Sequence, residues 1–325
     1  MSCCCTSGTP TAIPTTSWTS VTVQPAGLDS QQETRSHNDV NELTAATMPE
    51  HSADYGTADI WVDPVGGDDY GGDGSSGNPY QTVTYAVNQA SDGDVIMVKN
   101  GTNLNDGATV DSADAQDLVI VAENPGQVTL SAANIGAGCR GIIVEGIDSG
   151  GNSTVSSATD GVVLRDCGFE NLNVYGNDPN DTAVVLTECV ASGYLRVLTH
   201  GRLDRCRADE LLISGSGQMV KCIAETVAKV VETPPVYTID DCVVRNTIAD
   251  YLLVTSDSAP NSSEALASDY NDFVGDPNGD VARWNQTGVG TTYYSTISAW
   301  HTAIGQDAHS ISANPVFNGD YTLAY

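Results

Sequence analysis

Apolar residues in the middle of the chain occur in short runs that are rich in valine, isoleucine and leucine. Residues 161–164, 182–186 and 251–254 are examples, and glycine, asparagine, aspartate, serine or threonine residues flank them. Short β-branched runs between turn-forming residues are the pattern of β-strands. The sequence therefore predicts that strands dominate the middle of the chain.

One phrase recurs among these runs: an apolar residue, two mostly polar residues and a cysteine. It ends at Cys167, Cys189, Cys206, Cys222 and Cys242, and a version without cysteine ends at Ile147. A spacing of about 20 residues is too short for paired-helix repeats and fits one coil of a β-solenoid. If each phrase occupies the same place in successive coils, its last residues form one internal column.

Thiols serve as small buried hydrophobic groups in such a column. Residues stacked on neighbouring strands lie about 4.8 Å apart. Disulfide geometry tolerates this separation, so free and bridged thiols are both open. The predicted column consists of Ile147, Cys167, Cys189, Cys206, Cys222 and Cys242, with Tyr270 as a candidate to extend it.

The two ends of the repeat region carry further motifs. Residues 60–62 (IWV) lead through a glycine-rich loop to an amphipathic segment at 83–90, and residues 300–311 (WHTAIGQDAHSI) precede 313–317 (ANPVF). These motifs resemble the ends of the right-handed parallel β-helix family that includes pectate lyases, alginate lyases and phage tailspikes. The resemblance implies an all-β, right-handed parallel β-helix solenoid whose open end is covered by a capping helix at 83–90. It implies no particular chemistry, because many functions share this fold.

Three regions follow from these patterns. Residues 1–57 are rich in serine, threonine, proline and alanine and include Cys3, Cys4 and Cys5, so we expect an extended N-terminal arm for attachment or oligomerisation. Residues 58–255 are expected to form the parallel β-helix. Residues 256–325 are expected to form its last coil and C-terminal cap.

Charge excludes one class of partner. The formal net charge is −30, from 42 acidic and 12 basic residues, so nucleic-acid binding is not expected. Abundant aspartate, alanine, valine and threonine indicate a halophilic or marine source, because salt screens such a surface. No apolar stretch approaches the roughly 20 residues of a membrane span.

Candidate chemistry lies on the outer face of the repeats. A lyase of this fold would need acidic Ca²⁺ ligands and an Arg or Lys base nearby, and a hydrolase would need paired carboxylates. Charges of both signs along the columns favour an ion-paired surface instead. We therefore assign no catalytic residues, and the candidates for an enzyme are Arg205, Lys221, Asp240 and Asp241. The two outward columns are Arg165, Thr187, Asp204, Val220 and Asp240, and then Asp166, Glu188, Arg205, Lys221 and Asp241.

Other polar groups have two interpretations. His301, Asp307 and His309 suit either a transition metal or structural hydrogen bonds, and we favour the latter. The acidic loops 66–74, 177–181 and 276–280 are explained by turn formation, with bound Ca²⁺ or Na⁺ as the alternative. Aromatic residues that would serve as sugar platforms if exposed are Tyr175, Tyr194, Tyr237, Tyr251, Trp284, Tyr293 and Tyr294.

The family resemblance and the N-terminal segment together suggest a function. Proteins of this fold act mostly outside cells, yet the chain starts without a secretory signal. A virion protein meets both conditions. We expect a non-enzymatic, homo-oligomeric surface protein of a virus of a halophilic or marine microbe (a spike, turret or tail fibre). It would attach to other virion proteins through residues 1–57 and bind host surface glycans. The alternative is an extracellular polysaccharide lyase or glycoside hydrolase acting on acidic glycans, and a third interpretation is a cellular surface-layer or adhesion module.

Overall fold

The chain divides into two compact units, Met1–Gly56 and Thr57–Tyr325. The computed structural model describes residues 21–23, 31–37, 43–47, 55, 57–111, 116–156, 159–175, 184–198, 201–214, 217–231, 242–245, 247–249, 251–256 and 266–312. The first unit contains a three-stranded antiparallel sheet of β1 (Val21–Val23), β2 (Gln31–His37) and β3 (Leu43–Thr47). The prediction of an extended arm did not include β2 and β3.

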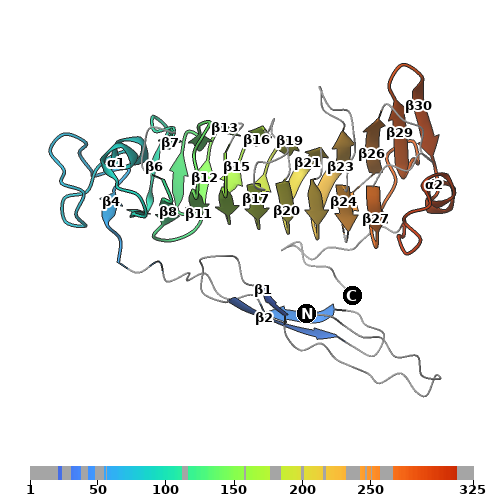
Figure 1. The fold of residues 1–325 in the computed structure, drawn as a ribbon, viewed down its shortest axis with the longest axis horizontal. Helices are drawn as coiled ribbons and strands as arrows, with labels where there is room; N and C mark the ends of the chain where they lie inside the picture. Colours follow the sequence, from blue (N-terminus) through green and yellow to red (C-terminus); the bar gives the residue numbers. More distant parts are fainter. Residues whose placement is uncertain are drawn as a thin grey trace. The chain divides into compact units, whose positions relative to one another are not determined.

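A ten-stranded parallel sheet runs along the second unit (Figure 1). Its inner positions are apolar and its outer positions are mixed: Leu164 is buried, while Val163 and Arg165 on either side are partly exposed. Leu164 lies in register with Val144 and Leu186 of the adjacent coils, so the core side chains stack. The strands are β4 (Ile60–Val62), β5 (Val95–Val98), β8 (Val119–Ala122), β11 (Ile143–Glu145), β14 (Val163–Arg165), β17 (Val184–Thr187), β20 (Gly201–Asp204), β22 (Gln218–Val220), β24 (Cys242–Arg245) and β27 (Leu266–Asp269).

A seventeen-stranded sheet completes the coils and consists of two ladders. The long strands β21 (Arg207–Ser214) and β23 (Ile223–Val231) take part in both ladders. The first ladder also contains β6 (Gly101–Asn103), β9 (Val128–Leu130), β12 (Ile147–Ser149), β15 (Gly168–Phe169), β18 (Val190–Ala191), β25 (Ile248–Ala249) and β28 (Asp272–Phe273). The second also contains β7 (Thr109–Val110), β10 (Asn134–Ile135), β13 (Asn152–Val155), β16 (Asn171–Tyr175), β19 (Tyr194–Leu198), β26 (Tyr251–Ser256), β29 (Ala282–Gln286) and β30 (Gly290–Tyr294).

Helices lie near the two ends of this unit (Figure 1). Thr82 caps α1 (Val83–Gln89) by accepting a hydrogen bond from the Tyr85 N–H, and α1 buries its apolar face in the core. Thr296 caps α2 (Ile297–Ile304) in the same way. Gly305 ends α2 in the left-handed conformation, at φ 71°. Before α2, β29 and β30 form an antiparallel hairpin that the sequence did not predict.

The second unit is therefore all-β apart from these helices and is built of long parallel sheets, which is the arrangement of a β-solenoid. This confirms the predicted all-β class and parallel strands. None of the helices in the described part of the chain is long and apolar enough to cross a membrane.

Six coils turn sharply where a strand of the ten-stranded sheet ends, after β11, β14, β17, β20, β22 and β27. The residue at each of these corners is left-handed, with φ between 50° and 71°. Only glycine adopts this conformation without a steric cost, which is roughly 1–2 kcal/mol for other residues. Gly146 is the one glycine in the series, and the other corner residues are Asp166, Glu188, Arg205, Lys221 and Tyr270.

The residue after each corner points into the core. Register in both neighbouring sheets places these residues in one stack, and each is at most 2% exposed: Ile147, Cys167, Cys189, Cys206 and Cys222.

Cys242 does not continue this stack, so the prediction was wrong for that residue. Val220 pairs with Arg245 and Ile223 pairs with Ile248, which places Thr247 on Cys222. The repeated phrase in this coil is 244–247, with threonine in the place of cysteine, and Cys242 lies in β24 opposite Leu266.

Tyr270 does not extend the column either. It occupies the left-handed corner of the next coil, and Asn271, which follows it, takes the buried position. The column therefore ends in two polar side chains, Thr247 and Asn271, both at most 2% exposed.

Candidate functional site

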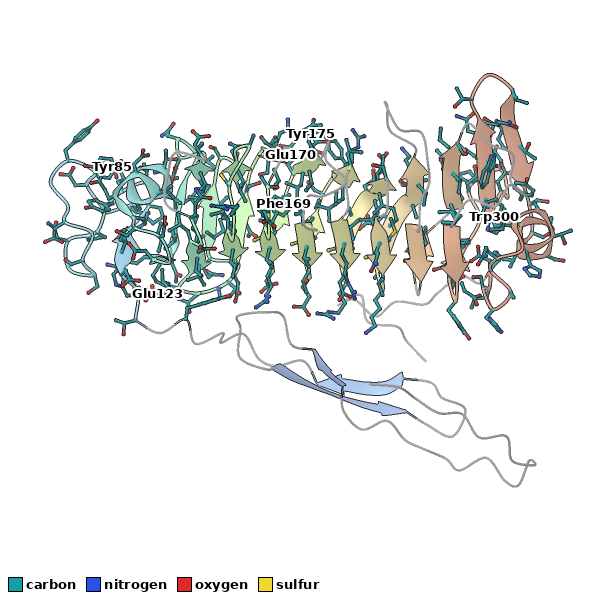
Figure 2. The ribbon with its side chains drawn as sticks, in the orientation of Figure 1. Tyr85, Glu123, Phe169, Glu170, Tyr175 and Trp300 are labelled. Carbon is teal, nitrogen blue, oxygen red and sulfur yellow. The ribbon has the colours of Figure 1, made fainter. Side chains whose placement is uncertain are left out.

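The register of the second ladder separates the tyrosines that face solvent from those that pack in the core. Tyr175 on β16 is 44% exposed and Tyr293 on β30 is 60% exposed. Trp284 and Tyr294 are buried instead and pack against Trp300. Tyr237 lies outside the described residues. Tyr175 and Tyr293 thus belong to the outer face of one ladder, and Figure 2 shows Tyr175 on the edge of the solenoid.

Arginines cover two further tyrosines on the same face. The guanidinium carbon of Arg196 lies 3.8 Å from the ring centroid of Tyr194, and that of Arg283 lies 4.3 Å from the centroid of Tyr251. Arg283 also approaches the Tyr293 ring, at 5.4 Å. Cation–π contacts of this kind fix both partners.

Carboxylates hold the cations in place. Glu210 on β21 accepts a hydrogen bond from Nε of Arg196 at 3.2 Å and pairs with Lys229 on β23. Arg283 pairs with Asp276 and, at 3.3 Å, with Asp280. These side chains are only partly exposed, between 5% and 36%. Arg196 and Arg283 each lie between a tyrosine ring and a carboxylate, and Lys229 pairs with a carboxylate.

The register makes this arrangement regular. Arg196, Leu212, Lys229, Leu253 and Arg283 lie opposite one another on successive strands, so cations and leucines alternate from coil to coil. We call the outward set the aromatic–ionic strip; it consists of Tyr175, Tyr194, Arg196, Glu210, Lys229, Tyr251, Arg283 and Tyr293.

Asparagines support one end of the aromatic–ionic strip. Nδ2 of Asn173 donates to the hydroxyl of Tyr194 at 3.1 Å, and Oδ1 of Asn171 accepts from the Tyr194 N–H at 3.2 Å. Asn171 also donates to Asn152 on the preceding coil, at 2.9 Å. These bonds orient Tyr194 before any ligand arrives.

The structure places two of the four enzyme candidates from the sequence, Arg205 and Lys221, on left-handed corners. Arg205 donates from Nε to Glu188 on the neighbouring coil at 3.0 Å and contacts Asp204 at 3.5 Å. Lys221 occupies the adjacent corner. This is the ion-paired arrangement that the alternating charges favoured, and such partly exposed pairs stabilise by at most about 1 kcal/mol each.

The remaining two enzyme candidates, Asp240 and Asp241, lie outside the described residues. Arg245, and not Asp240, stands opposite Val220 in the outward column.

The thiols of the internal column are unbridged in the part of the chain that the structure describes. Burial is the main cause that raises the pKa of Cys189, Cys206 and Cys222 well above its usual range. Each thiol donates to a carbonyl of the preceding coil, at 3.4 Å. Protonated, enclosed thiols are poor nucleophiles and poor metal ligands.

The C-terminal residues form a hydrogen-bonded cluster. Asp307 is 1% exposed and accepts from Trp300 Nε1 at 2.7 Å, Ser310 Oγ at 2.6 Å and Asn271 Nδ2 at 3.1 Å. His301 bonds to the carbonyl of Gln306 at 2.6 Å. These contacts are structural.

His309 lies apart from that cluster. Its Nδ1 contacts Asp269 at 2.8 Å, and its ring stacks on Tyr270. No group of three or more histidine, cysteine, aspartate or glutamate side chains forms a metal-ligand cluster among the described residues.

Two of the acidic loops use their carboxylates within the chain. Asp69 accepts bonds from the N–H groups of Gln81 and Thr82 before α1. Asp276 accepts from the N–H groups of Asn278 and Asp280. Such bonds are those of turns and helix ends. Loop 177–181 lies outside the described residues, and bound Ca²⁺ or Na⁺ stays the untested alternative.

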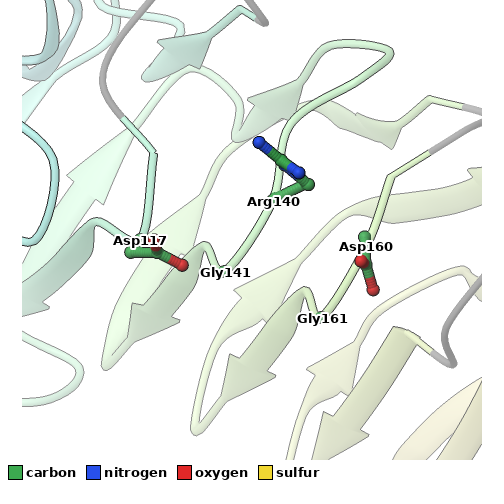
Figure 3. Close-up of a pocket in the computed structure, with 5 residues that line it drawn as sticks. All are labelled: Asp117, Arg140, Gly141, Asp160 and Gly161. Atoms are coloured by element: carbon green, nitrogen blue, oxygen red, sulfur yellow. The ribbon is translucent and has the colours of Figure 1, made fainter.

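Figure 3 shows a shallow depression on the corners that precede the ten-stranded sheet. Asp117, Arg140, Gly141, Asp160 and Gly161 line it. Three of these residues are left-handed, at φ 58° for Asp117, 66° for Gly141 and 65° for Gly161. The depression thus consists mainly of turn backbone with exposed side chains around it.

Comparison with known proteins gave no match: no family model, no curated protein and no solved structure matches this chain. The aromatic–ionic strip must therefore be interpreted from its own chemistry.

Proposed function

We propose that the protein is a non-enzymatic attachment protein whose solenoid binds glycans on the aromatic–ionic strip. The observation that carries the proposal is the combination of exposed Tyr175 and Tyr293 with arginine, lysine and carboxylate groups that neighbouring side chains already orient. Sugar rings pack on aromatic faces, and their hydroxyls need fixed donors and acceptors. A ligand that binds oriented groups loses less entropy in ordering them.

The test is retention of the full chain in gels that contain immobilised polysaccharides. Tyr175→Ala and Tyr293→Ala are each expected to weaken retention. Tyr70→Ala is the matched control, because Tyr70 is 96% exposed and lies in the loop before α1, away from the aromatic–ionic strip. Equal retention of all variants, or none by the wild type on any glycan, would contradict the proposal.

A polysaccharide lyase or glycoside hydrolase remains the alternative. The ion pairs that Arg205 forms with Glu188 and Asp204 support a structural role for this side chain. Release of unsaturated or reducing ends from acidic glycans, lost in Arg205→Ala or Asp241→Ala, would show that the protein is an enzyme and not an attachment protein.

We further propose that the protein belongs to the surface of a virus of a halophilic or marine microbe, as a spike, turret or tail fibre, with residues 1–57 attached to other virion proteins. The support is the resemblance to the right-handed, pectate-lyase-like β-helix family, whose members include tailspikes, and the net charge of −30. Mass spectrometry of purified particles is expected to detect the chain. Its absence, or full folding of the protein without salt, would count against this placement.

A further inference from the structure

We propose that the ligand of the aromatic–ionic strip is an uncharged polysaccharide that lies along the solenoid axis. The inference rests on the proposed glycan-binding function and adds the charge and the length of the ligand. Two observations carry it: the charge balance of the strip and the distance between its most exposed tyrosines.

The cations of the aromatic–ionic strip already contact carboxylates, of which Glu210 belongs to the strip and Asp276 and Asp280 border it. Arg196 and Lys229 share Glu210, and Arg283 contacts both Asp276 and Asp280. Three cations thus face three carboxylates, on a protein whose formal net charge is −30. An anionic glycan would have to displace these carboxylates and approach an acidic surface, and both steps oppose binding.

An uncharged glycan meets no such opposition. Ionised donors and acceptors form stronger hydrogen bonds than neutral ones, and the strip offers both kinds at fixed positions: the guanidinium of Arg196 as a donor and the carboxylate of Glu210 as an acceptor. Because no net charge is neutralised on binding, the affinity is expected to depend little on salt.

The length of the ligand follows from the ladder. Tyr175 lies on β16 and Tyr293 on β30, and β19, β21, β23, β26 and β29 lie between them. Neighbouring strands are about 4.8 Å apart, so the two exposed tyrosines are separated by roughly 29 Å along the ladder. A mono- or disaccharide cannot contact both, whereas an extended oligosaccharide can.

The experiment is calorimetric titration of the full chain with two oligosaccharide series of two to eight units. One series is an uncharged galactan, and the other is the galacturonan that carries a carboxylate on each unit. Each titration is repeated at low and high salt. We expect the galactan to bind, with an affinity that rises at least about tenfold from the dimer to the longest oligomer and changes little with salt.

Variants separate the two parts of the inference. Glu210→Gln is expected to weaken galactan binding about tenfold, because it removes an ionised acceptor. Asp209→Asn on the same strand is the matched control, because Asp209 is exposed and is not part of the strip. Tyr293→Ala is expected to weaken binding of the octamer and to leave the dimer unchanged.

Each failure has its own meaning. Tighter binding of galacturonan, falling steeply with salt, would overturn the uncharged ligand and leave the proposed glycan function intact. Equal affinities for dimer and octamer would overturn the lengthwise arrangement. Binding of neither series, together with no retention in any polysaccharide gel, would remove the proposed function itself.

Discussion

The thiol of Cys206 donates a hydrogen bond to the backbone carbonyl of Leu186 on the preceding coil, across 3.4 Å. Cys189 makes the same bond to Leu164, and Cys222 makes it to Leu203. In the last described coil, Nδ2 of Asn271 donates to the carbonyl of Val244, which is the equivalent position. At these positions of the internal column the side chain is a donor as well as a core group, and cysteine combines both properties in a small side chain; Ile147, at the start of the column, does not donate.

Substitutions at Cys206 test this role. Cys206→Ala is expected to lower the free energy of unfolding by about 1–2 kcal/mol, through the lost contacts and the lost donor. Cys206→Val is expected to cost about 1–3 kcal/mol, because an extra methyl group must fit between stacked neighbours. Cys206→Ser keeps a donor and is expected to be the least destabilising. Urea unfolding measures all three, and a serine variant less stable than the alanine variant would show that the thiol acts only as an apolar filler.

The buried thiols also predict a pH dependence. Burial raises the pKa of Cys189, Cys206 and Cys222 in the folded state, so these thiols keep their protons at pH values where an unfolded thiol, with a pKa near 8.5, loses its own. Their contribution to stability is complete below about pH 8.5. It decreases above that value, by about 1.4 kcal/mol per pH unit for each thiol.

Unfolding curves between pH 7 and 10 measure this decrease, and Cys206→Ala is expected to make the slope shallower by the share of one thiol. Thiol reagents give an independent measurement. The column cysteines are expected to react only after unfolding, because they are at most 2% exposed. Rapid modification of the folded protein at these cysteines would contradict the enclosed column.

The left-handed corners predict an unusual order of stability among glycine and valine variants. Lys221 has φ 55°, a conformation that costs a β-branched residue most and glycine least. We expect Lys221→Gly to stay within about 1 kcal/mol of the wild type and Lys221→Val to be less stable by roughly 1–2 kcal/mol. Thr187, the residue immediately before the corner residue Glu188, lies at the end of strand β17 and is the control. There valine is expected to be more stable than glycine. Thermal unfolding of the four variants decides, and the same order at both positions would exclude corner strain as the cause.

The sequence predicted the coils well and their register only in part. In the repeated phrases from Cys167 to Cys222 the cysteine directly follows a corner, because each of these coils buries a small side chain there that donates to the preceding coil. At Cys242 the same residue pattern occurs three residues before the end of β24, and Thr247 takes the position in the column instead. Spacing alone could not distinguish these cases, since the length of each turn varies.

The aromatic–ionic strip could be predicted even less. Tyr194 and Arg196 are two residues apart and share a face of β19, which alternation does predict. Their partner Glu210 lies on another strand, and its position depends on the number of residues in the intervening coil. The bulge between Ala208 and Glu210 shifts the alternation further. The sequence therefore identified the candidate tyrosines but could not show which of them face solvent.

Substitution of Asp307 is expected to cause the largest loss of stability. Its buried carboxylate accepts hydrogen bonds from Trp300 in α2, from Ser310, and from Asn271 at the end of the internal column. These bonds join α2 to the last coil. Asp307→Ala leaves these donors buried without an acceptor and is expected to cost at least about 3 kcal/mol. Asp307→Asn keeps the shape and one acceptor oxygen and should lose less. His309→Ala is the matched control, since that side chain is 60% exposed and its pair with Asp269 contributes at most about 1 kcal/mol. Thermal unfolding with and without a chelator completes the test: if EDTA destabilised the wild type and left Asp307→Ala unchanged, a bound metal, and not the hydrogen-bonded cluster, would hold the C-terminal end together.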